Sequence, residues 1–200
     1  MSSLLVGRKA PGFSTKAVSK GQLMDCNLHD YLGKYVVLFF YPLDFTFVCP
    51  TELHACQAKK EEFEQRGAEL MGCSIDSGYS HLAWLNTPRS KGGIEGIEYL
   101  LLSDLNKTIS KEYQVLDEKE GIAYRGLFII DPEGIICHQV VNDLPIGRSV
   151  EETLRVLDAI IFHKEYGEVC PANWVPGKKG MQTTQEGLVH FFEETSSQKS

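Results

Sequence analysis

Residues 35–52, YVVLFFYPLDFTFVCPTE, decide the fold of this chain. The near-continuous apolar run Tyr35–Phe40 predicts a buried β-strand, and Thr51–Arg66 has the spacing of an amphipathic helix. Cys49 therefore lies at a strand-to-helix junction, at the positive end of the helix dipole, where a thiolate is stabilised. A buried structural cysteine is the alternative interpretation of this position taken alone.

The start of this helix has more than one candidate cap. Thr46 and Thr51 are both residue types that cap helix N-termini, and Pro50 suits a first helical turn. With either cap, the cysteine precedes or opens the helix.

The composition is that of an ordinary globular domain able to bury a sizeable core, with 200 residues, 22.4 kDa, 42% hydrophobic and 24% charged residues. A net charge of -7 and the lack of a long basic run argue against nucleic-acid or anionic-membrane partners. No apolar run has membrane-spanning length, and the N-terminus lacks the apolar region of a signal peptide. We therefore expect a cytoplasmic protein.

The six cysteines are not expected to form a static disulfide framework in a reducing compartment. No C-x-x-C pair is present, which argues against a thioredoxin-type dithiol and a paired-cysteine zinc site. Cys49 and Cys56 would lie about 10 Å apart along one helix, beyond disulfide reach. Cys73 and Cys137 fall in apolar strand-like runs and are predicted core residues, whereas Cys26 lies in a polar stretch and has no assigned role.

The order of the remaining elements predicts an α/β domain with a mixed central sheet flanked by helices. Asp131-Pro132-Glu133-Gly134 has the residues of a hairpin turn between the last two strands. Further strands are expected at 68–75, 99–102, 127–130 and 135–141, and further helices at 79–86, 107–113 and 150–166.

The composition changes after Tyr166, where Gly and Pro become frequent and the apolar residues lose their regular spacing. We expect an extended C-terminal arm with a short helix at 184–194, and we divide the chain into a domain at 4–163 and an arm at 164–200. Cys170 and Trp174 in this otherwise polar arm suggest docking onto another surface; an incidental tail cysteine is the alternative.

Two cysteine motifs follow each other along the chain. Pro42, Thr46 and Cys49 form P-x-x-x-T-x-x-C, and EVCPANW surrounds Cys170. Together with Arg125 in YRGLF, they closely resemble the typical 2-Cys peroxiredoxins, thiol peroxidases related to bacterial alkyl hydroperoxide reductase. The resemblance covers nearly the whole chain and implies a thioredoxin-like fold.

The resemblance implies that the two cysteines act in turn. Cys49 would attack the peroxide O–O bond and become a sulfenic acid, and Cys170 from the partner chain would condense with it to an intersubunit disulfide. Thioredoxin or a flavin-linked disulfide reductase would restore both thiols. The implied assembly is a homodimer, built further into a ring of five dimers, and no metal or organic cofactor is implied.

The same resemblance gives supporting roles to five residues. Thr46 would hydrogen-bond the attacked peroxide oxygen, and Arg125 would hold both thiolate and peroxide. Pro42 would shield the site from water, and Glu52 and Arg148 would orient the guanidinium of Arg125. Each also has a structural alternative, such as an N-cap for the threonine or an ordinary ion pair for the arginine.

Thiol chemistry independently requires such donors. A cysteine of pKa about 8.5 is about 3% thiolate at pH 7, and one of pKa about 6 is about 90%. This roughly thirty-fold gain is largely offset by a roughly tenfold loss of nucleophilicity. Fast peroxide reduction must therefore come from donors fixed around the sulfur. Because a cysteine in a packed turn would face a pocket, disulfide formation should require the turn around Cys49 to unfold.

Two positions depart from features that make many eukaryotic members prone to overoxidation. Their Gly-Gly-Leu-Gly loop reads Gly92-Gly93-Ile94-Glu95 here, and Phe191 replaces the tyrosine of their C-terminal Tyr-Phe pair. Glutamate takes a positive φ angle less readily than glycine. We therefore predict a less tightly held arm and moderate resistance to sulfinic acid formation. The alternative to an enzyme is a binding role, as a holdase chaperone or a peroxide-sensing redox relay.

Overall fold

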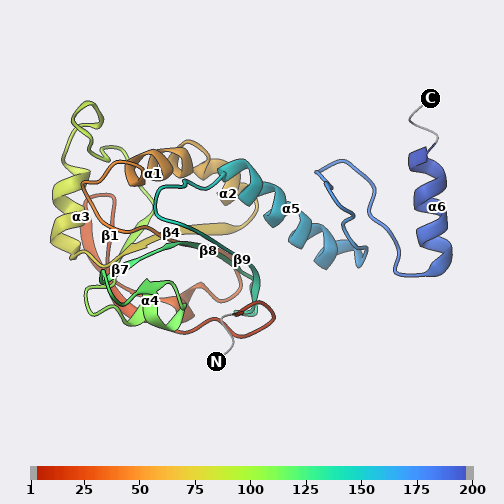
Figure 1. Ribbon diagram of the computed structural model, residues 1–200, viewed down its shortest axis with the longest axis horizontal. Helices are drawn as coiled ribbons and strands as arrows, with labels where there is room; N and C mark the ends of the chain where they lie inside the picture. The colour runs from red at the N-terminus through yellow and green to blue at the C-terminus, as the bar shows by residue number, and fades with distance from the viewer. Residues whose placement is uncertain (1–3, 197–200) are drawn as a thin grey trace. The chain divides into compact units, whose positions relative to one another are not determined.

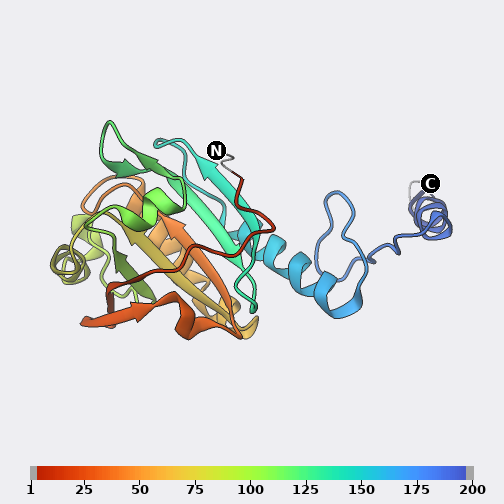
Figure 2. The ribbon, with the colours of Figure 1, turned by 90° about the horizontal axis from the view of Figure 1, so that it is seen from below.

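A seven-stranded mixed sheet organises the chain up to Val150 (Figure 1). The computed structural model describes residues 4–196. The strand order is β2-β1-β5-β4-β3-β8-β9, and Figure 2 shows the β1–β2 hairpin at one edge and β9 at the other. The strands of this sheet are β1 Ser14–Ser19, β2 Gln22–Asn27, β3 Tyr35–Phe40, β4 Ala68–Ser74, β5 Leu100–Ser103, β8 Arg125–Ile130 and β9 Ile136–Asn142.

β3, β4 and β5 run parallel, and the other neighbours are antiparallel. This confirms the predicted mixed α/β sheet. The predicted hairpin turn is also confirmed, because the N–H of Gly134 donates to the carbonyl of Asp131 at 2.9 Å. A two-stranded ribbon, β6 Leu116–Asp117 with β7 Ile122–Ala123, lies outside the main sheet.

Helices cover both faces of the sheet. α1 and α2 lie on one face and α4 on the other (Figure 1), while α3 packs against β1 and β5. β3 lies between β4 and β8, and its apolar residues are buried on both faces, as expected of a central strand. The helices of this unit are α1 Cys49–Ala58, α2 Lys60–Gln65, α3 Gly78–Leu85 and α4 Thr108–Glu112, with 3₁₀ turns η1 Leu28–Tyr31 and η2 Arg89–Lys91.

The helix start differs from the prediction. α1 begins at Cys49 itself, with Val48 as N-cap and no side-chain cap, so neither predicted threonine cap is correct. Thr46 donates its hydroxyl hydrogen to the carbonyl of Leu43 at 2.9 Å, and Thr51 already lies inside the first turn. The single helix predicted to Arg66 is also divided into α1 and α2.

The hairpin β1–β2 was not predicted, because only Ala17, Val18 and Cys26 of its residues are buried. Cys26 is thus a core residue, as is Cys73, whose predicted burial is confirmed. Cys137 is only half-buried, so its assignment to the core was wrong. It lies on β9, the edge strand, which has a neighbouring strand of the sheet, β8, on one side only.

The chain from Glu151 onward forms a second compact unit. It contains most of α5 (Val150–Tyr166), an intervening loop and α6 (Gln185–Ser196). The loop is closed by two backbone hydrogen bonds of 2.9 Å between Val169 and Met181. The boundary predicted between residues 163 and 164 stays a prediction. Within residues 4–196, no helix has the length and apolar character needed to cross a membrane.

Candidate active site

Cys49 is the first residue of α1 and is almost completely buried, with 1% of its surface exposed. The strand β3 ends at Phe40, and residues 41–48 lead from it to the helix start. Pro50 has no N–H, and the N–H of Thr51 donates to the carbonyl of Val48 at 3.0 Å. Neither Pro50 nor Thr51 therefore offers the sulfur a free N–H donor.

Arg125, the first residue of β8, supplies positive charge beside the sulfur. Its Nη1 lies 3.5 Å from the Sγ of Cys49 and 2.7 Å from Oε2 of Glu52. Its Nε donates to the carbonyl of Leu144 at 2.6 Å. Because these acceptors hold the guanidinium from two directions, one N–H edge is fixed against the sulfur.

Glu52, one turn beyond the cysteine, binds two arginines. Besides Arg125, it accepts three hydrogen bonds from Arg148: from the backbone N at 2.9 Å, Nε at 2.8 Å and Nη2 at 3.0 Å. Nη1 of Arg148 reaches the carbonyls of Phe40 and Gly126. All three charged side chains are 4–6% exposed. One carboxylate neutralises only one of two guanidinium groups, so the cluster keeps a positive charge that a thiolate would balance.

Two other predicted residues lie in the segment before the helix. Pro42 is buried, and Thr46 is half-buried. The Thr46 hydroxyl hydrogen is already donated to Leu43, so toward a peroxide this oxygen can only accept a hydrogen bond. The structure thus brings Cys49, Glu52, Arg125 and Arg148 into direct contact in one cluster and places Thr46 three residues before the cysteine.

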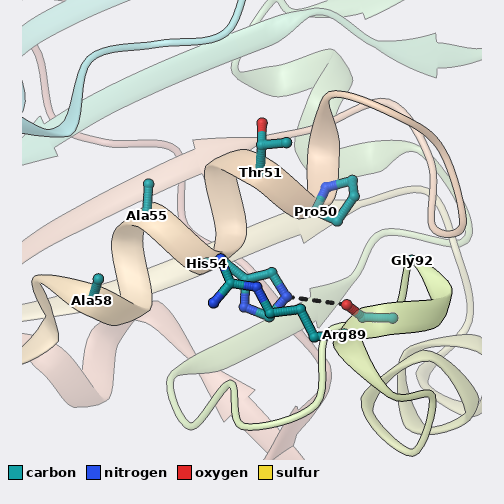
Figure 3. Close-up of a pocket in the computed structure, with 8 residues that line it drawn as sticks. Pro50, Thr51, His54, Ala55, Ala58, Arg89 and Gly92 are labelled. Carbon is teal, nitrogen blue, oxygen red and sulfur yellow. Dashed lines mark hydrogen bonds between the residues drawn. The ribbon is translucent and has the colours of Figure 1, made fainter.

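The loop that carries Gly92 and Gly93 lies against the outer face of α1 (Figure 3). His54 Nε2 lies 3.0 Å from the carbonyl of Gly93, beside an open pocket of about 400 Å³ that Arg89 also lines. A Cβ at Gly93 would meet the carbonyl oxygen of Thr87 at 1.9 Å, so only glycine fits there.

The predicted strain at Glu95 is absent. Gly92 and Gly96 adopt positive φ angles, of 78° and 90°, but Glu95 does not. The N–H of Glu95 donates to the carbonyl of Thr87 at 3.3 Å. The glutamate therefore occupies a position that does not require glycine, and this part of the argument for a loosened arm is wrong.

Cys170 belongs to the second unit, where it is half-buried. Its Sγ lies 3.5 Å from the carbonyl of Ala159 on α5. Trp174, 4% exposed, packs against Phe162 of α5 with tilted rings whose centroids lie 4.9 Å apart, and its carbonyl accepts from Arg155 at 2.7 Å. The arm therefore docks its tryptophan on its own helix and holds the thiol beside it.

Burial raises the pKa of the Cys170 thiol, while the charge of Arg155 opposes that rise. Burial also raises the pKa of Cys56 to about 12, with the charge of Arg148 opposing the shift. Cys73 is shifted well above its usual range for the same reason, burial. The thiols of Cys56 and Cys73 therefore stay protonated at neutral pH and are poor nucleophiles.

Sequence reasoning missed the carbonyls of Phe40, Gly126 and Leu144, which orient the two arginines. Backbone acceptors have no sequence signal. It also missed a buried polar cluster around Asp44 and His81, although two polar side chains within apolar surroundings were a signal that could have revealed it.

Comparison with known proteins identifies this arrangement. A model of the AhpC/TSA family matches residues 6–139, and one described as the C-terminal domain of 1-Cys peroxiredoxin matches residues 159–194. The chain belongs to the AhpC/TSA family. It is 54% identical to a thioredoxin peroxidase of Echinococcus granulosus, over 94% of this chain and 97% of that one. It is 50% identical to peroxiredoxin-2 of Mus musculus, over 94% of both chains.

A solved structure of reduced 2-Cys peroxiredoxin from Plasmodium vivax matches with a TM-score of 0.92 at 49% identity, covering 95% of this chain and 99% of that one. The AhpC of Enterococcus faecalis matches with a TM-score of 0.78 at 40% identity, covering 84% and 99%. These relatives confirm the predicted 2-Cys peroxiredoxin family, the thioredoxin-like fold and the enzyme class, a thiol-dependent peroxidase.

Proposed function

We propose that this peroxiredoxin reduces hydrogen peroxide and organic hydroperoxides with Cys49 as the nucleophile. The observation that carries the proposal is the contact between Arg125 and the Cys49 sulfur at 3.5 Å, in a cluster with one positive charge in excess. Such a fixed cation stabilises both the attacking thiolate and the charge that develops on the peroxide.

In the first step, the sulfur of Cys49 forms a bond to one peroxide oxygen as the O–O bond breaks. The leaving oxygen takes a proton and departs as water or an alcohol, and the sulfur becomes a sulfenic acid. Arg125 donates to the reacting oxygens, and Thr46 accepts the hydrogen of the attacked one. Pro42 keeps water from the sulfur, while Glu52 and Arg148 hold Arg125 in place.

In the second step, the Cys170 thiol attacks the sulfenic sulfur, and water leaves as the disulfide forms. The 1% exposure of Cys49 means that no second thiol can reach its sulfur while the first turn of α1 is folded. That turn must therefore unfold before the disulfide forms. A thioredoxin-type dithiol then reduces the disulfide by exchange and is itself oxidised; a flavin-linked reductase is the alternative donor.

We place Cys170 on a second copy of the chain, in a homodimer that assembles into a ring of five dimers in the cytoplasm. The sheet offers a surface for the dimer at β9. This edge strand pairs with β8 on one side. On its other side, residues 7–9 bond at Ile135 and Ile136, and the N–H of Leu5 donates to the side-chain oxygen of Gln139 at 2.9 Å. Val141 on the same strand is 44% exposed. Such an edge is a template for pairing with another strand.

Peroxide consumption coupled to thioredoxin, thioredoxin reductase and NADPH tests the proposal. Wild type is expected to turn over many times, and Cys49→Ser is expected to be inactive. Suppression of client aggregation that needs no peroxide and survives Cys49→Ser, without turnover, would instead support the holdase alternative. Oxidation of client thiols in place of thioredoxin would support the redox relay.

A further inference from the structure

A buried polar cluster holds the chain immediately before the Cys49 segment. Asp44 is 7% exposed, and its Oδ1 accepts from the hydroxyl of Tyr41 at 2.9 Å. Its Oδ2 accepts from the hydroxyl of Ser80 at 2.7 Å and lies 2.8 Å from Nδ1 of His81. Its backbone N–H donates to Asp76 at 2.9 Å. Asp44, just before the Cys49 segment, is thus tied to Tyr41 just after β3, to α3 and to the loop before α3.

The contacts of His81 define where its hydrogens lie. Nε2 faces the carbonyl of Leu102 on β5 at 3.1 Å, and a carbonyl only accepts, so Nε2 carries a hydrogen. A second proton lies between Nδ1 and the carboxylate of Asp44, because two lone pairs at 2.8 Å would repel. Both side chains are fully buried, at 0% and 2% exposure, so this pair is not screened by water.

Tyr41 keeps its hydroxyl hydrogen for the same carboxylate. Burial, and after it the charge of Asp44, raise the pKa of Tyr41 well above its usual range. Burial and the charge of Asp44 also raise the pKa of Asp76. The carboxylate of Asp44 therefore acts on both neighbouring groups, and Nδ1 of His81 lies 2.8 Å from it.

A second set of contacts fixes the chain beyond the Cys49 turn. Glu52 is bound by the two arginines, the carbonyl of Leu53 accepts from Tyr99 at 2.9 Å, and His54 meets the carbonyl of Gly93 (Figure 3). Between these contacts and Asp44 lie residues 45–51.

Residues 45–51 make few hydrogen bonds to the rest of the protein, although the ring of Phe45 packs against Trp84 of α3 with ring centroids 5.6 Å apart. Phe45 follows Asp44 with a φ angle of 54°, and Phe47 is 92% exposed. Apart from the α1 ladder, the hydrogen bonds described for this segment to the rest of the protein are Thr46 to Leu43 and Arg125 to Cys49. The segment is thus bounded by two fixed points.

We propose that Asp44 and His81 are positioning residues that fix the upstream end of the Cys49 segment. The pair holds residues 45–51 in the folded arrangement that reacts with peroxide and opposes the unfolding that precedes disulfide formation. This inference rests on the proposed function, because the pair is expected to speed the reaction of Cys49 with peroxide and to slow disulfide formation.

Two substitutions of His81 separate the contacts of its ring. In His81→Asn the amide nitrogen replaces Nδ1 and still donates to Asp44, whereas in His81→Gln it replaces Nε2 and still donates to Leu102. Stopped-flow tryptophan fluorescence, with acid quench and mass spectrometry, measures the rate constants of Cys49 oxidation and of disulfide formation in each variant.

For His81→Gln we expect Cys49 oxidation to slow about tenfold or more and disulfide formation to become several-fold faster. For His81→Asn both rate constants should stay within about threefold of wild type. Asp44→Asn should resemble His81→Gln. Tyr113→Phe is the control, because it removes a hydrogen bond of 3.0 Å from Tyr113 to Pro11, away from this segment; its two rate constants should match wild type.

A parallel fall of both rate constants that follows the melting temperature would overturn the proposal, because that is the behaviour of general structural damage. Asparagine being more harmful than glutamine at position 81 would overturn it as well. If wild type itself does not react with peroxide, the proposed function fails first, and the chain has no peroxide step for the pair to position.

Discussion

Replacing Glu52 by glutamine perturbs the centre of the arginine cluster without changing its shape. The carboxylate accepts four hydrogen bonds, two on each oxygen. An amide keeps one acceptor oxygen, and its NH₂ group then faces two N–H donors. Two of the four bonds are lost, and two guanidinium groups are left buried without a counter-charge.

Hydrogen bonds to charged groups contribute about 1.5–3 kcal/mol each, and breaking a buried ion pair costs about 3–5 kcal/mol. Two lost bonds give about 3–6 kcal/mol and the broken ion pair about 3–5 kcal/mol, so we expect a loss of about 3–5 kcal/mol for Glu52→Gln. For a chain of this size that corresponds to a fall in melting temperature of about 6–20 °C. Because Arg125 is no longer held against Cys49, the rate constant for peroxide should fall about 100-fold.

Circular dichroism melting and competition with a haem peroxidase for hydrogen peroxide measure the two effects. Glu62→Gln is the matched control, since it makes the same chemical change in an exposed pair with Lys59 at 2.8 Å, where the glutamate side chain is 43% exposed. That variant should lie within about 0.5 kcal/mol of wild type. If Glu52→Gln melts and reacts like wild type, the cluster does not hold Arg125 and the reasoning is refuted.

Three further results are expected. Iodoacetamide at pH 7 should alkylate Cys49 in the native protein but not Cys56, whose pKa burial raises to about 12; labelling of Cys56 at a similar rate by mass spectrometry would contradict this. Disulfide formation should accelerate as pH rises above neutral, because burial raises the pKa of Cys170. Arg155→Met should slow disulfide formation several-fold at pH 7, whereas Arg155→Lys should not. A rate of disulfide formation that does not depend on pH would contradict the role given to Cys170. Phe191→Tyr restores a hydroxyl whose hydrogen bond would contribute about 0.5–1.5 kcal/mol, and it should increase sulfinylation of Cys49 at micromolar peroxide. Equal sulfinylation in both proteins would remove the remaining reason for the predicted resistance.

Most of the sheet strands that were predicted are buried on both faces, and the edge strand β9 was predicted from its apolar run. Tyr35–Phe40 was predicted with correct bounds because a central strand has a continuous apolar run. β1 and β2 were missed because an edge hairpin keeps polar side chains on its open face. Their one local signal was Lys20-Gly21, where both residues adopt positive φ angles of 48° and 73°.

The side chains of the site were predicted more completely than the contacts that hold them. The motif around Cys49 pointed to the nucleophile that we propose, but neither threonine cap predicted for its helix is correct, because the hydroxyl of Thr46 bonds backward to Leu43 and Thr51 lies inside the first turn. Tertiary contacts decide such competition, and sequence shows only the candidates. Asp44 was missed because its partners at positions 76, 80 and 81, on α3 and in the loop before it, reach it only when the chain folds.

A non-reducing gel of reduced protein treated with one equivalent of hydrogen peroxide tests whether Cys49 and Cys170 of two chains form a disulfide. Wild type should give a disulfide-linked dimer that disappears in Cys49→Ser and in Cys170→Ser. A wild-type chain that remains monomeric while Cys49 is oxidised would contradict this expectation, and the role given to Cys170 would fall.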